Sequence, residues 1–516
     1  MSIRTASERS GSMKKGDTFT LRPERVMKRR SGLIYGQFIE HFHRQIYGGV
    51  FDPGSPFADE DGFRTDVMEA MRKIRVPILR WPGGCFVSSY HWKKAVGPER
   101  IPVFDKSWRV EDPNLFGTDE YIAMCRRIGC EPYICTNAGT GTPEEMSDWV
   151  EYCNLKDQGE YARLRARNGH SEPYGVRYWS IGNENYGAWE LGAKGVGEWG
   201  RLVLESAKLM RHVDPDVKLS AAALPDLDWN VALLKACGEH LDWISIHKYW
   251  NLMAQENVFY TYEESMACTN DLDTDINRVR GLLTAMGLEK KIRIAYDEWN
   301  LRGWHHPNVH TVRQGRTKEE YITPRDKNDI NSDYTMADAV FTACFLNTLN
   351  RHSDAVAMAA FAPVVNTRGC IFTHPGGIVL RSTYHVFDLY VNHLGEEILD
   401  GWLQTGETMP AASRGGRRED VKVLDVLACR RERDGAVTVA AVNKHPDEKR
   451  ALNLRFEGGP AGGEYRVLSV TGDSTESYND IGVDGVKLTE SPRRAFEGTL
   501  CCELPPHSVQ VIEIMQ

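Results

Sequence analysis

Short apolar runs alternate with longer segments of helical period between about residues 33 and 395. The runs lie at residues 33–39, 77–81, 131–136, 176–181, 218–223, 243–247, 292–296 and 355–361. Amphipathic stretches between them include residues 63–74, 119–128, 196–212 and 334–350. Strands that alternate with helices in this way predict an α/β fold, a (β/α)8 TIM barrel enlarged by loop insertions. The alternative is an open doubly wound sheet, but no GxGxxG turn supports it.

The pattern changes after residue 395 to short β-rich runs separated by glycine-containing turns. These runs lie at residues 421–428, 436–442, 451–456, 465–470 and 509–514. They predict a C-terminal antiparallel β-sandwich. We therefore divide the chain into a loose terminus (1–16), a strand that joins the sandwich (17–32, through 18–21), a catalytic barrel (33–395) and the β-sandwich (396–516).

Composition excludes several classes of partner. Hydrophobic residues make up 41% and charged residues 26%, and the net charge is −9. Nucleic acid and anionic membrane both attract clustered positive charge, so we expect neither as a partner. No signal-like apolar stretch occurs in the first thirty residues, and the twelve cysteines form no CxxC pair. We expect buried thiols and a cytoplasmic location.

Two glutamates follow apolar runs at the predicted rim of the barrel. The fourth run leads into Asn183-Glu184, and the seventh leads into Asp297-Glu298. Active sites of (β/α)8 barrels lie at the carboxyl ends of the strands. One such glutamate is as often a solvated loop acid as a functional group. Two of them, on strands that lie across the barrel from each other, predict a paired-carboxylate site.

A carboxylate pair suits the cleavage of a glycosidic bond. One carboxyl group protonates the leaving oxygen, and the other attacks the anomeric carbon or activates water. The acid has to carry a proton, and we expect its apolar neighbours Trp179 and Tyr186 and the charge of its partner to raise its pKa.

Five motifs resemble the α-L-arabinofuranosidases of glycoside hydrolase family 51, within the large clan of retaining (β/α)8-barrel glycosidases. They read YGQFIEH at residues 35–41, IYGGVFDPGS at 46–55, LRWPGG at 79–84, YWSIGNE at 178–184 and YDEWN at 296–300. The resemblance covers residues 33–390 in order and spacing, and the β-rich tail also fits. It implies a retaining exo-hydrolase that removes terminal α-L-arabinofuranosyl residues from arabino- or arabinoxylo-oligosaccharides. It also implies a homo-oligomer, such as a hexamer.

The resemblance implies roles for single residues. Glu184 resembles the catalytic acid/base and Glu298 the nucleophile. Asn183 resembles the amide that holds the sugar 2-hydroxyl, and Glu40 the carboxylate that binds outer hydroxyls. Tyr249 resembles the phenol beside the nucleophile.

Further substrate contacts are expected at His247, in the same segment as Tyr249, and at Trp108, an apolar wall for the sugar. For Trp108, ordinary packing is an equal alternative. Two positions depart from the family pattern. Cys85 stands where an asparagine often occurs, and Pro363 stands where a glutamine often reaches the sugar. Because a pocket selects its sugar by pairing hydroxyls, both departures bear on which furanose binds.

We expect no cofactor. His41 with His43, and His305 with His306, resemble metal pairs, but no third ligand falls at a suitable spacing. Three alternatives stay open: a furanosidase of other specificity, such as a β-D-galactofuranosidase; a non-catalytic sugar-binding protein; and a metal-dependent barrel hydrolase. The presence of both Glu184 and Glu298 counts against the binding protein.

Overall fold

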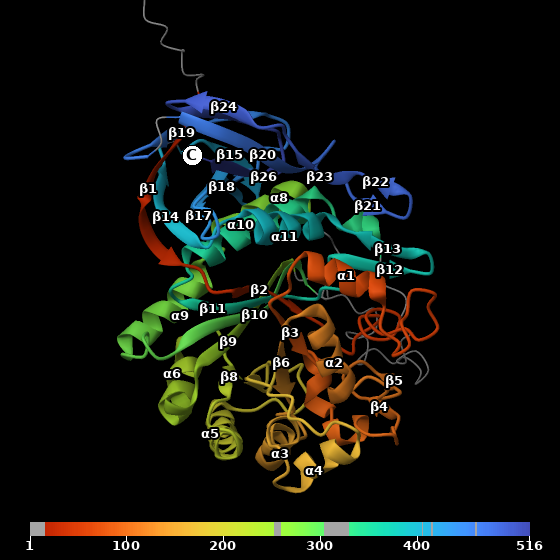
Figure 1. Ribbon diagram of the computed structural model, residues 1–516. Coiled ribbons are helices and arrows are strands. Elements are labelled where there is room, and N and C mark those ends of the chain that lie inside the picture. Colours follow the sequence, from red (N-terminus) through yellow and green to blue (C-terminus); the bar gives the residue numbers. More distant parts are fainter. Residues whose placement is uncertain are drawn as a thin grey trace, which may run out of the picture.

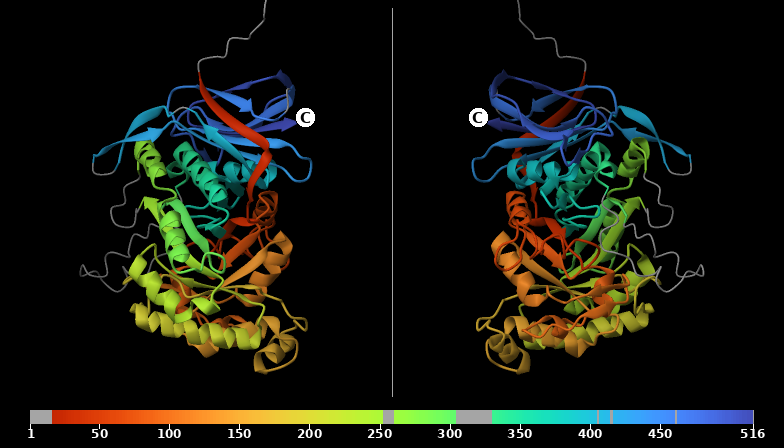
Figure 2. Two further views of the ribbon diagram at one scale, coloured as in Figure 1. Left: turned by 90° about the vertical axis from the view of Figure 1, so that its left-hand side faces the viewer. Right: turned by 90° about the vertical axis from the view of Figure 1, so that its right-hand side faces the viewer.

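The computed structural model describes residues 16–251, 260–303, 330–404, 406–413, 416–459 and 462–515. A closed barrel of parallel strands and a second, largely antiparallel sheet stack on each other (Figure 1). Helices α10 (Met336–Arg351) and α11 (Ser382–His393) lie between the two, and both side views show the same layering (Figure 2).

Eight strands close the barrel, and each pairs in parallel with its neighbours. They are β2 (Leu33–Phe38), β3 (Ile78–Trp81), β6 (Glu131–Thr136), β7 (Tyr178–Ile181), β8 (Lys218–Ala222), β9 (Trp243–Asn251), β10 (Arg293–Arg302) and β11 (Val356–Phe361). Each falls on one of the eight predicted apolar runs, so the predicted fold class is confirmed. Closure brings the carboxyl ends of all eight strands to one rim.

Strands β9 and β10 extend beyond their apolar runs. The runs end at residues 247 and 296, whereas the strands continue to Asn251 and Arg302. Their polar residues stay paired across the barrel, as in the ladder position that joins Glu298 to His247. The strand ends predicted here were wrong because these side chains satisfy one another inside the barrel mouth and not in solvent.

Helices surround the barrel: α1 (Thr65–Lys73), α2 (Thr118–Ile128), α3 (Pro143–Asn154), α4 (Glu160–Arg167), α5 (Val196–Val213), α6 (Leu227–Cys237), α8 (Tyr262–Ala267) and α9 (Thr274–Ala285). In α5, apolar residues four apart, Trp199 and Val203, are buried, as the amphipathic pattern predicts. The same prediction was wrong for α10. Its residues from Met336 to Asn350 are all buried because the helix is covered on both sides.

The second sheet has ten strands. They are β1 (Asp17–Arg29), β14 (Glu397–Leu403), β17 (Leu424–Arg430), β18 (Val437–Asn443), β19 (Arg450–Phe456), β20 (Gly462–Gly472), β23 (Val486–Glu490), β24 (Arg494–Glu497), β25 (Leu500–Leu504) and β26 (Ser508–Met515). The N-terminal strand β1 pairs with β14 and β19. We therefore propose that residues 17–32 belong with the C-terminal domain, and that residue 396 begins the rest of it.

Four hairpins complete the described structure: β4 (Val103–Asp105) with β5 (Val110–Asp112), β12 (Ile371–His374) with β13 (Gly377–Leu380), β15 (Thr408–Ala412) with β16 (Arg418–Lys422), and β21 (Asn479–Asp480) with β22 (Val483–Asp484). No helix among the described residues is both long and apolar enough to cross a membrane. The twelve cysteines are free thiols, most of them buried, with Cys501 exposed.

Candidate active site

Glu184 and Glu298 meet at the carboxyl rim of the barrel. Glu184 lies just after β7, and Glu298 lies within β10. One carboxylate oxygen of each and a ring nitrogen of His247 all lie within 4.8 Å of one another. The fold thus brings together two carboxyl groups that are 114 residues apart in the sequence, at a spacing that suits reaction on one bond.

Glu298 is buried and held from two sides. The Nη1 of Arg80, on β3, donates to its Oε2 at 2.8 Å. The hydroxyl of Tyr249, on β9, donates to its Oε1 at 2.5 Å. The cation and the phenol donor together hold both oxygens of the carboxyl group and fix its direction. A carboxylate held in this way can act chemically as a nucleophile.

Glu184 stands on a sharply turned backbone. Its φ is +46°, in the left-handed region, and Gly182 two residues earlier has φ +71°. The turn presents the Glu184 carboxyl group to His247, whose Nδ1 lies 2.9 Å from Oε1, and to Trp189, whose Nε1 donates to Oε2 at 2.8 Å. Strain of this kind persists where surrounding contacts fix the residue, as they do here.

The expected rise in the pKa of Glu184 was wrong for the free protein. Burial does raise the pKa, but hydrogen bonding and charge from His247, with help from Trp189, outweigh burial and lower it. The apolar neighbours correctly predicted the desolvation. The opposing group is His247 on β9, which the local sequence around Glu184 does not reveal.

His247 is a buried imidazolium between acidic groups. Its Nε2 lies 3.2 Å from Ser245 Oγ, and that hydroxyl donates its own hydrogen to Asp297 at 2.6 Å. Its Nδ1 faces Glu184 and, at 3.6 Å, Glu298. Both ring nitrogens therefore face acceptors and carry hydrogens. Burial lowers the pKa of His247, but the charges of Glu298, Asp297 and Glu184 raise it to about 10.

Arg80 connects the nucleophile to Asn183. Its Nη2 donates to Asn183 Oδ1 at 2.8 Å, and Asn183 Nδ2 donates to Glu190 at 3.3 Å. The two contacts fix which end of the amide faces which neighbour. Asn183 is thereby held in one orientation next to Glu184, and its role at the sugar 2-hydroxyl stays a prediction.

Glu40 is a third carboxyl group at the site, and it is buried. Its Oε1 accepts from the backbone N–H of Phe86 at 3.0 Å and from Trp108 Nε1 at 2.9 Å. Burial, with the charge of Glu298, raises the pKa of Glu40 to about 8. At neutral pH a part-protonated Glu40 can donate to a sugar hydroxyl as well as accept from one.

Two glycines make room for this arrangement. A Cβ on Gly83, whose φ is +142°, would lie 2.2 Å from Glu40 Cγ. A Cβ on Gly84 would lie 3.4 Å from a carboxylate oxygen of Glu40 and 3.4 Å from one of Glu298. Gly84 therefore borders the space between the two carboxyl groups, so a side chain here would enter that space.

Trp108 and Cys85 also border the site. Trp108, in the turn between β4 and β5, is buried, and its ring packs against Phe42 with centroids 4.2 Å apart. Its indole contact to Glu40 adds a polar role to the expected apolar wall. Cys85 begins a short 3-10 helix, Cys85–Ser89, and its sulfur lies near Glu184 and Glu190.

Three site residues were missed by the sequence interpretation. Arg80, inside the quoted motif of residues 79–84, is a fully buried arginine in an apolar strand, and that pattern is itself a signal. Glu190 is buried, and burial raises its pKa to about 7. Arg368 donates to the Tyr249 hydroxyl at 3.1 Å and lies after β11, near the position where Pro363 replaces a polar family residue. Only the loop conformation brings it there.

Of the two histidine pairs suggested as metal ligands, only the pair of His41 and His43 lies among the described residues. His41 is buried, its Nδ1 lies 2.9 Å from Asp112, and its Nε2 accepts from Trp81 at 3.1 Å. Both of its nitrogens are therefore engaged within the protein. His305 and His306 lie outside the described residues. Among the described residues, two groups are close enough to hold a metal ion, and both contain Glu184.

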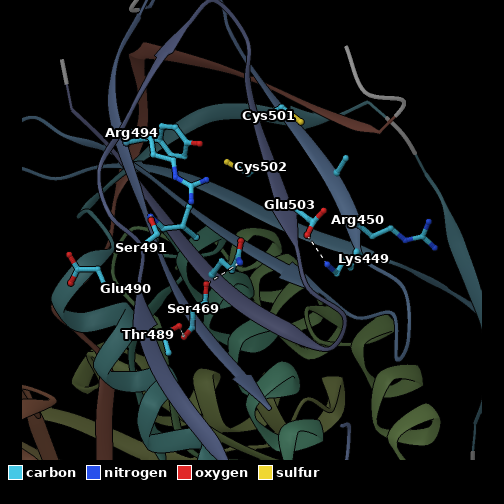
Figure 3. Close-up of a pocket in the computed structure, with 14 residues that line it drawn as sticks. Lys449, Arg450, Ser469, Thr489, Glu490, Ser491, Arg494, Cys501, Cys502 and Glu503 are labelled. Carbon is cyan, nitrogen blue, oxygen red and sulfur yellow. Dashed lines mark hydrogen bonds and ion pairs between the residues drawn. The ribbon is translucent and has the colours of Figure 1, made fainter. Parts of the chain in front are cut away.

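A separate cavity of about 610 Å³ opens between strands of the C-terminal domain (Figure 3). Residues of β19, β20, β23, β24 and β25 line it, and none of the predicted site residues does. Lys449 and Glu503 point toward each other there and form an ion pair of 3.0 Å. The predicted carboxylate pair therefore lies in the barrel and not at this cavity.

Known proteins resemble the chain along almost its whole length. The α-L-arabinofuranosidase 1 domain matches residues 70–267, and the α-L-arabinofuranosidase C-terminal domain matches residues 297–508. A probable α-L-arabinofuranosidase C of Aspergillus clavatus is 34% identical over 506 residues, which cover 93% of each chain. An intracellular exo-α-(1→5)-L-arabinofuranosidase of Acetivibrio thermocellus is 32% identical over 498 residues, which cover 93% of this chain and 96% of that one.

Solved structures agree. The α-L-arabinofuranosidase of Thermotoga maritima, in complex with arabinose, has a TM-score of 0.84 and 34% identity, and the match covers 97% of this chain and 100% of that one. A family 51 α-L-arabinofuranosidase of Thermotoga petrophila gives a TM-score of 0.84 at 35% identity with the same coverage. The resemblance read from five motifs is confirmed, and the chain belongs to the α-L-arabinofuranosidases of glycoside hydrolase family 51.

Proposed function

We propose that this protein is a retaining exo-hydrolase that releases terminal α-L-arabinofuranosyl residues from arabino- or arabinoxylo-oligosaccharides. The observation that carries the mechanism is the carboxylate pair, with oxygens of Glu184 and Glu298 within 4.8 Å of each other. Retaining glycosidases hold their carboxyl groups about 5 Å apart, whereas inverting enzymes need roughly 6.5 Å or more to fit a water.

The first step forms a bond between Glu298 and the anomeric carbon. As the bond between that carbon and the leaving oxygen breaks, Glu184 gives its proton to the oxygen. The Tyr249 hydroxyl and the Arg80 guanidinium hold the Glu298 carboxyl group in one direction until it reacts. The product is a glycosyl ester on Glu298 and a free alcohol.

The second step reverses the roles. Glu184, now ionised, takes a proton from water while the water oxygen attacks the anomeric carbon and releases Glu298. Two inversions give net retention of configuration. The same residue acts first as an acid and then as a base, so its pKa has to respond to the charge on Glu298.

His247 supplies that response. Its Nδ1 hydrogen lies on the 2.9 Å contact with Glu184, so the two groups share one proton. The proton rests on His247 while Glu298 is ionised, because the Glu298 charge is the foremost influence that raises the His247 pKa. A transfer to Glu184 gives the acid its proton without a supply from solvent.

The contrast in burial around the carboxylate pair fits exo action on a single sugar. Glu40, Trp108 and Asn183 are all buried. Trp189, which donates to Glu184, is 60% exposed. A terminal furanose fills the buried end, and the leaving sugar lies toward Trp189. A β-D-galactofuranosidase stays the second candidate. Cys85 and Pro363 depart from the family pattern at positions expected to bind sugar hydroxyls, so the preferred furanose can differ.

The activity is tested with a panel of nitrophenyl furanosides and pyranosides. We expect the highest kcat/KM on the α-L-arabinofuranoside, and proton NMR of the first product should show retained configuration. A preference for β-D-galactofuranoside would favour the second candidate. Inversion would contradict the double displacement, and no turnover of any glycoside by folded protein would favour a binding protein. Full activity after exhaustive chelation would exclude the metal-dependent alternative.

The role of His247 is tested by the variant His247→Asn. Asparagine can still hydrogen-bond Glu184 but cannot hold an exchangeable proton for it. In the native site the shared proton leaves only as the pH passes the raised pKa of His247, about 10. The alkaline limb of the kcat/KM profile should therefore move to lower pH by at least about one unit, since it then reports Glu184 alone. If the alkaline limb of the kcat/KM profile stays in place and kcat/KM falls equally at every pH, His247 has a structural role only.

We also propose an intracellular location, because the relative from Acetivibrio thermocellus is named intracellular. The oligosaccharide substrate is the partner that the family supports. Assembly into a homo-oligomer, such as a hexamer, stays a prediction.

A further inference from the structure

Cys85, Glu184 and Glu190 form a compact cluster on the outer side of the acid/base. The Cys85 sulfur and one carboxylate oxygen from each glutamate all lie within 4.8 Å of one another. Cys85 comes from the 3-10 helix after β3, and both glutamates come from the loop after β7. Two separate rim segments thus converge on one point.

The cluster has unused acceptor capacity. Glu190 is 4% exposed, and its Oε2 accepts from Asn183. Ser88 and Cys85 lie close enough to the carboxyl group to influence its pKa by hydrogen bonding, but neither meets Oε1 at full hydrogen-bonding geometry. A buried carboxylate oxygen without a donor is costly and indicates a site for a ligand that is positively charged or donates hydrogen bonds. The side chains of Cys85 and Glu184 lie next to it.

The two sides of Glu184 differ in charge balance. Toward Glu298, the imidazolium of His247 and the guanidinium of Arg80 compensate the carboxylates. Toward Glu190, burial and the charge of Glu184 raise the pKa of Glu190, hydrogen bonds with Ser88, Cys85 and Asn183 lower it, and none of these groups is a cation. Burial and the charges of Glu190, Glu184 and Glu40 raise the pKa of the Cys85 thiol. A bound cation would instead favour the Cys85 thiolate and lower the pKa of the thiol.

We propose that Cys85, Glu184 and Glu190 bind a thiophilic divalent cation, such as Zn²⁺ or Cd²⁺, and that the bound ion inhibits the enzyme. One sulfur and two carboxylate oxygens are a ligand set that suits such ions, with a fourth position for water. Ligand atoms of a tetrahedral zinc site lie roughly 3.5 Å apart, so the side chains move together by about 1 Å. Binding releases the Cys85 proton to solvent, and the sulfur electron pair forms the bond to the metal.

The inhibition follows from the shared ligand and rests on the proposed function. Glu184 cannot protonate a leaving oxygen while its carboxylate binds a metal. The ion acts as a regulator or inhibitor and not as a cofactor. The second group, Glu184 with His247 and Glu298, is the weaker site, because His247 already holds a proton where a metal would bind.

The experiment titrates full-length protein with Cd²⁺ and follows the near-ultraviolet charge-transfer absorption of a cadmium–thiolate bond. Cys501→Ser is the matched control, because Cys501 is an exposed thiol in β25 of the other domain. We expect one equivalent of bound Cd²⁺ with thiolate absorption in both the native protein and this control. Cys85→Ser should lose the absorption. In parallel, Zn²⁺ should inhibit hydrolysis, and a chelator should reverse the inhibition.

Glu190→Gln provides a second variant that keeps the thiol. It removes one anionic ligand at nearly constant volume, so the Zn²⁺ concentration for half inhibition should rise at least about tenfold relative to that variant's own metal-free rate. Thiolate absorption that persists in Cys85→Ser, or Zn²⁺ sensitivity unchanged in both variants, would overturn the site. Cd²⁺ binding that depends on Cys85 in a protein without glycosidase activity would overturn the proposed function and leave the metal site standing.

Discussion

Replacement of Glu298 by alanine should lower kcat/KM by about 10⁴-fold or more, because no other described carboxylate at the site can form the glycosyl ester in its place. Glu40 is held against Phe86 and Trp108, and Glu184 is needed as the acid. The measurement is steady-state hydrolysis of the nitrophenyl arabinofuranoside. A furanose-shaped epoxide or fluorosugar inactivator should label Glu298 alone, as located by peptide mass spectrometry.

Glu298→Gln is the matched control. Alanine leaves Arg80 buried beside an empty space, which costs stability, whereas glutamine keeps the volume, and its carbonyl oxygen can still accept from Arg80 while its NH2 group faces the Tyr249 oxygen. Both variants should be inactive, and the glutamine variant should unfold at nearly the native temperature. A labelled carboxylate other than Glu298, or either variant with near-native turnover, would refute the assignment.

Replacement of Glu184 by alanine should affect poor leaving groups far more than good ones. General acid catalysis contributes about 10²–10⁴-fold, and a nitrophenolate leaves without a proton. We therefore expect glycosylation to slow by roughly 10³-fold on an arabino-oligosaccharide and by less than about tenfold on a nitrophenyl furanoside. Pre-steady-state measurement of the first step on both substrates gives the comparison.

Azide provides the control for this variant. Azide attacks the glycosyl ester without a general base, so it should restore turnover of the nitrophenyl substrate and give a glycosyl azide of retained configuration. Trp189→Phe, which removes the indole donor to Glu184 and keeps the carboxyl group, should show no such rescue. Equal losses on both substrates, with no response to azide, would make Glu184 a structural residue.

The sequence was sufficient for the barrel because each of the eight strands is a locally apolar run with helical segments between. It also predicted that Glu184 and Glu298 lie close together, because both follow such runs and the topology of a barrel sends all strand ends to one rim. Both conclusions depend on patterns within a dozen neighbouring residues. The family resemblance added roles that the pattern itself does not assign.

The tertiary structure decided the charge state of the site. The pKa of Glu184 is lowered and that of Glu40 raised to about 8, although both are largely enclosed carboxyl groups at a barrel rim. The difference is the partner: His247 lies beside Glu184, whereas Glu298 lies near Glu40. Such partners come from other strands, and their distances are set only when the barrel closes.

The same reason explains the residues that the sequence did not reveal. Glu190 and Arg368 lie in loops, and no periodic pattern marks a loop residue as inward-facing. Helix α10 lost its expected polar face because the C-terminal sheet covers it. Local patterns determine which segments form strands and helices, because backbone propensity and burial of one face are local. The pairing of charged groups and the burial of a helix on both sides depend on contacts between segments far apart in the chain. Only the folded structure decides them.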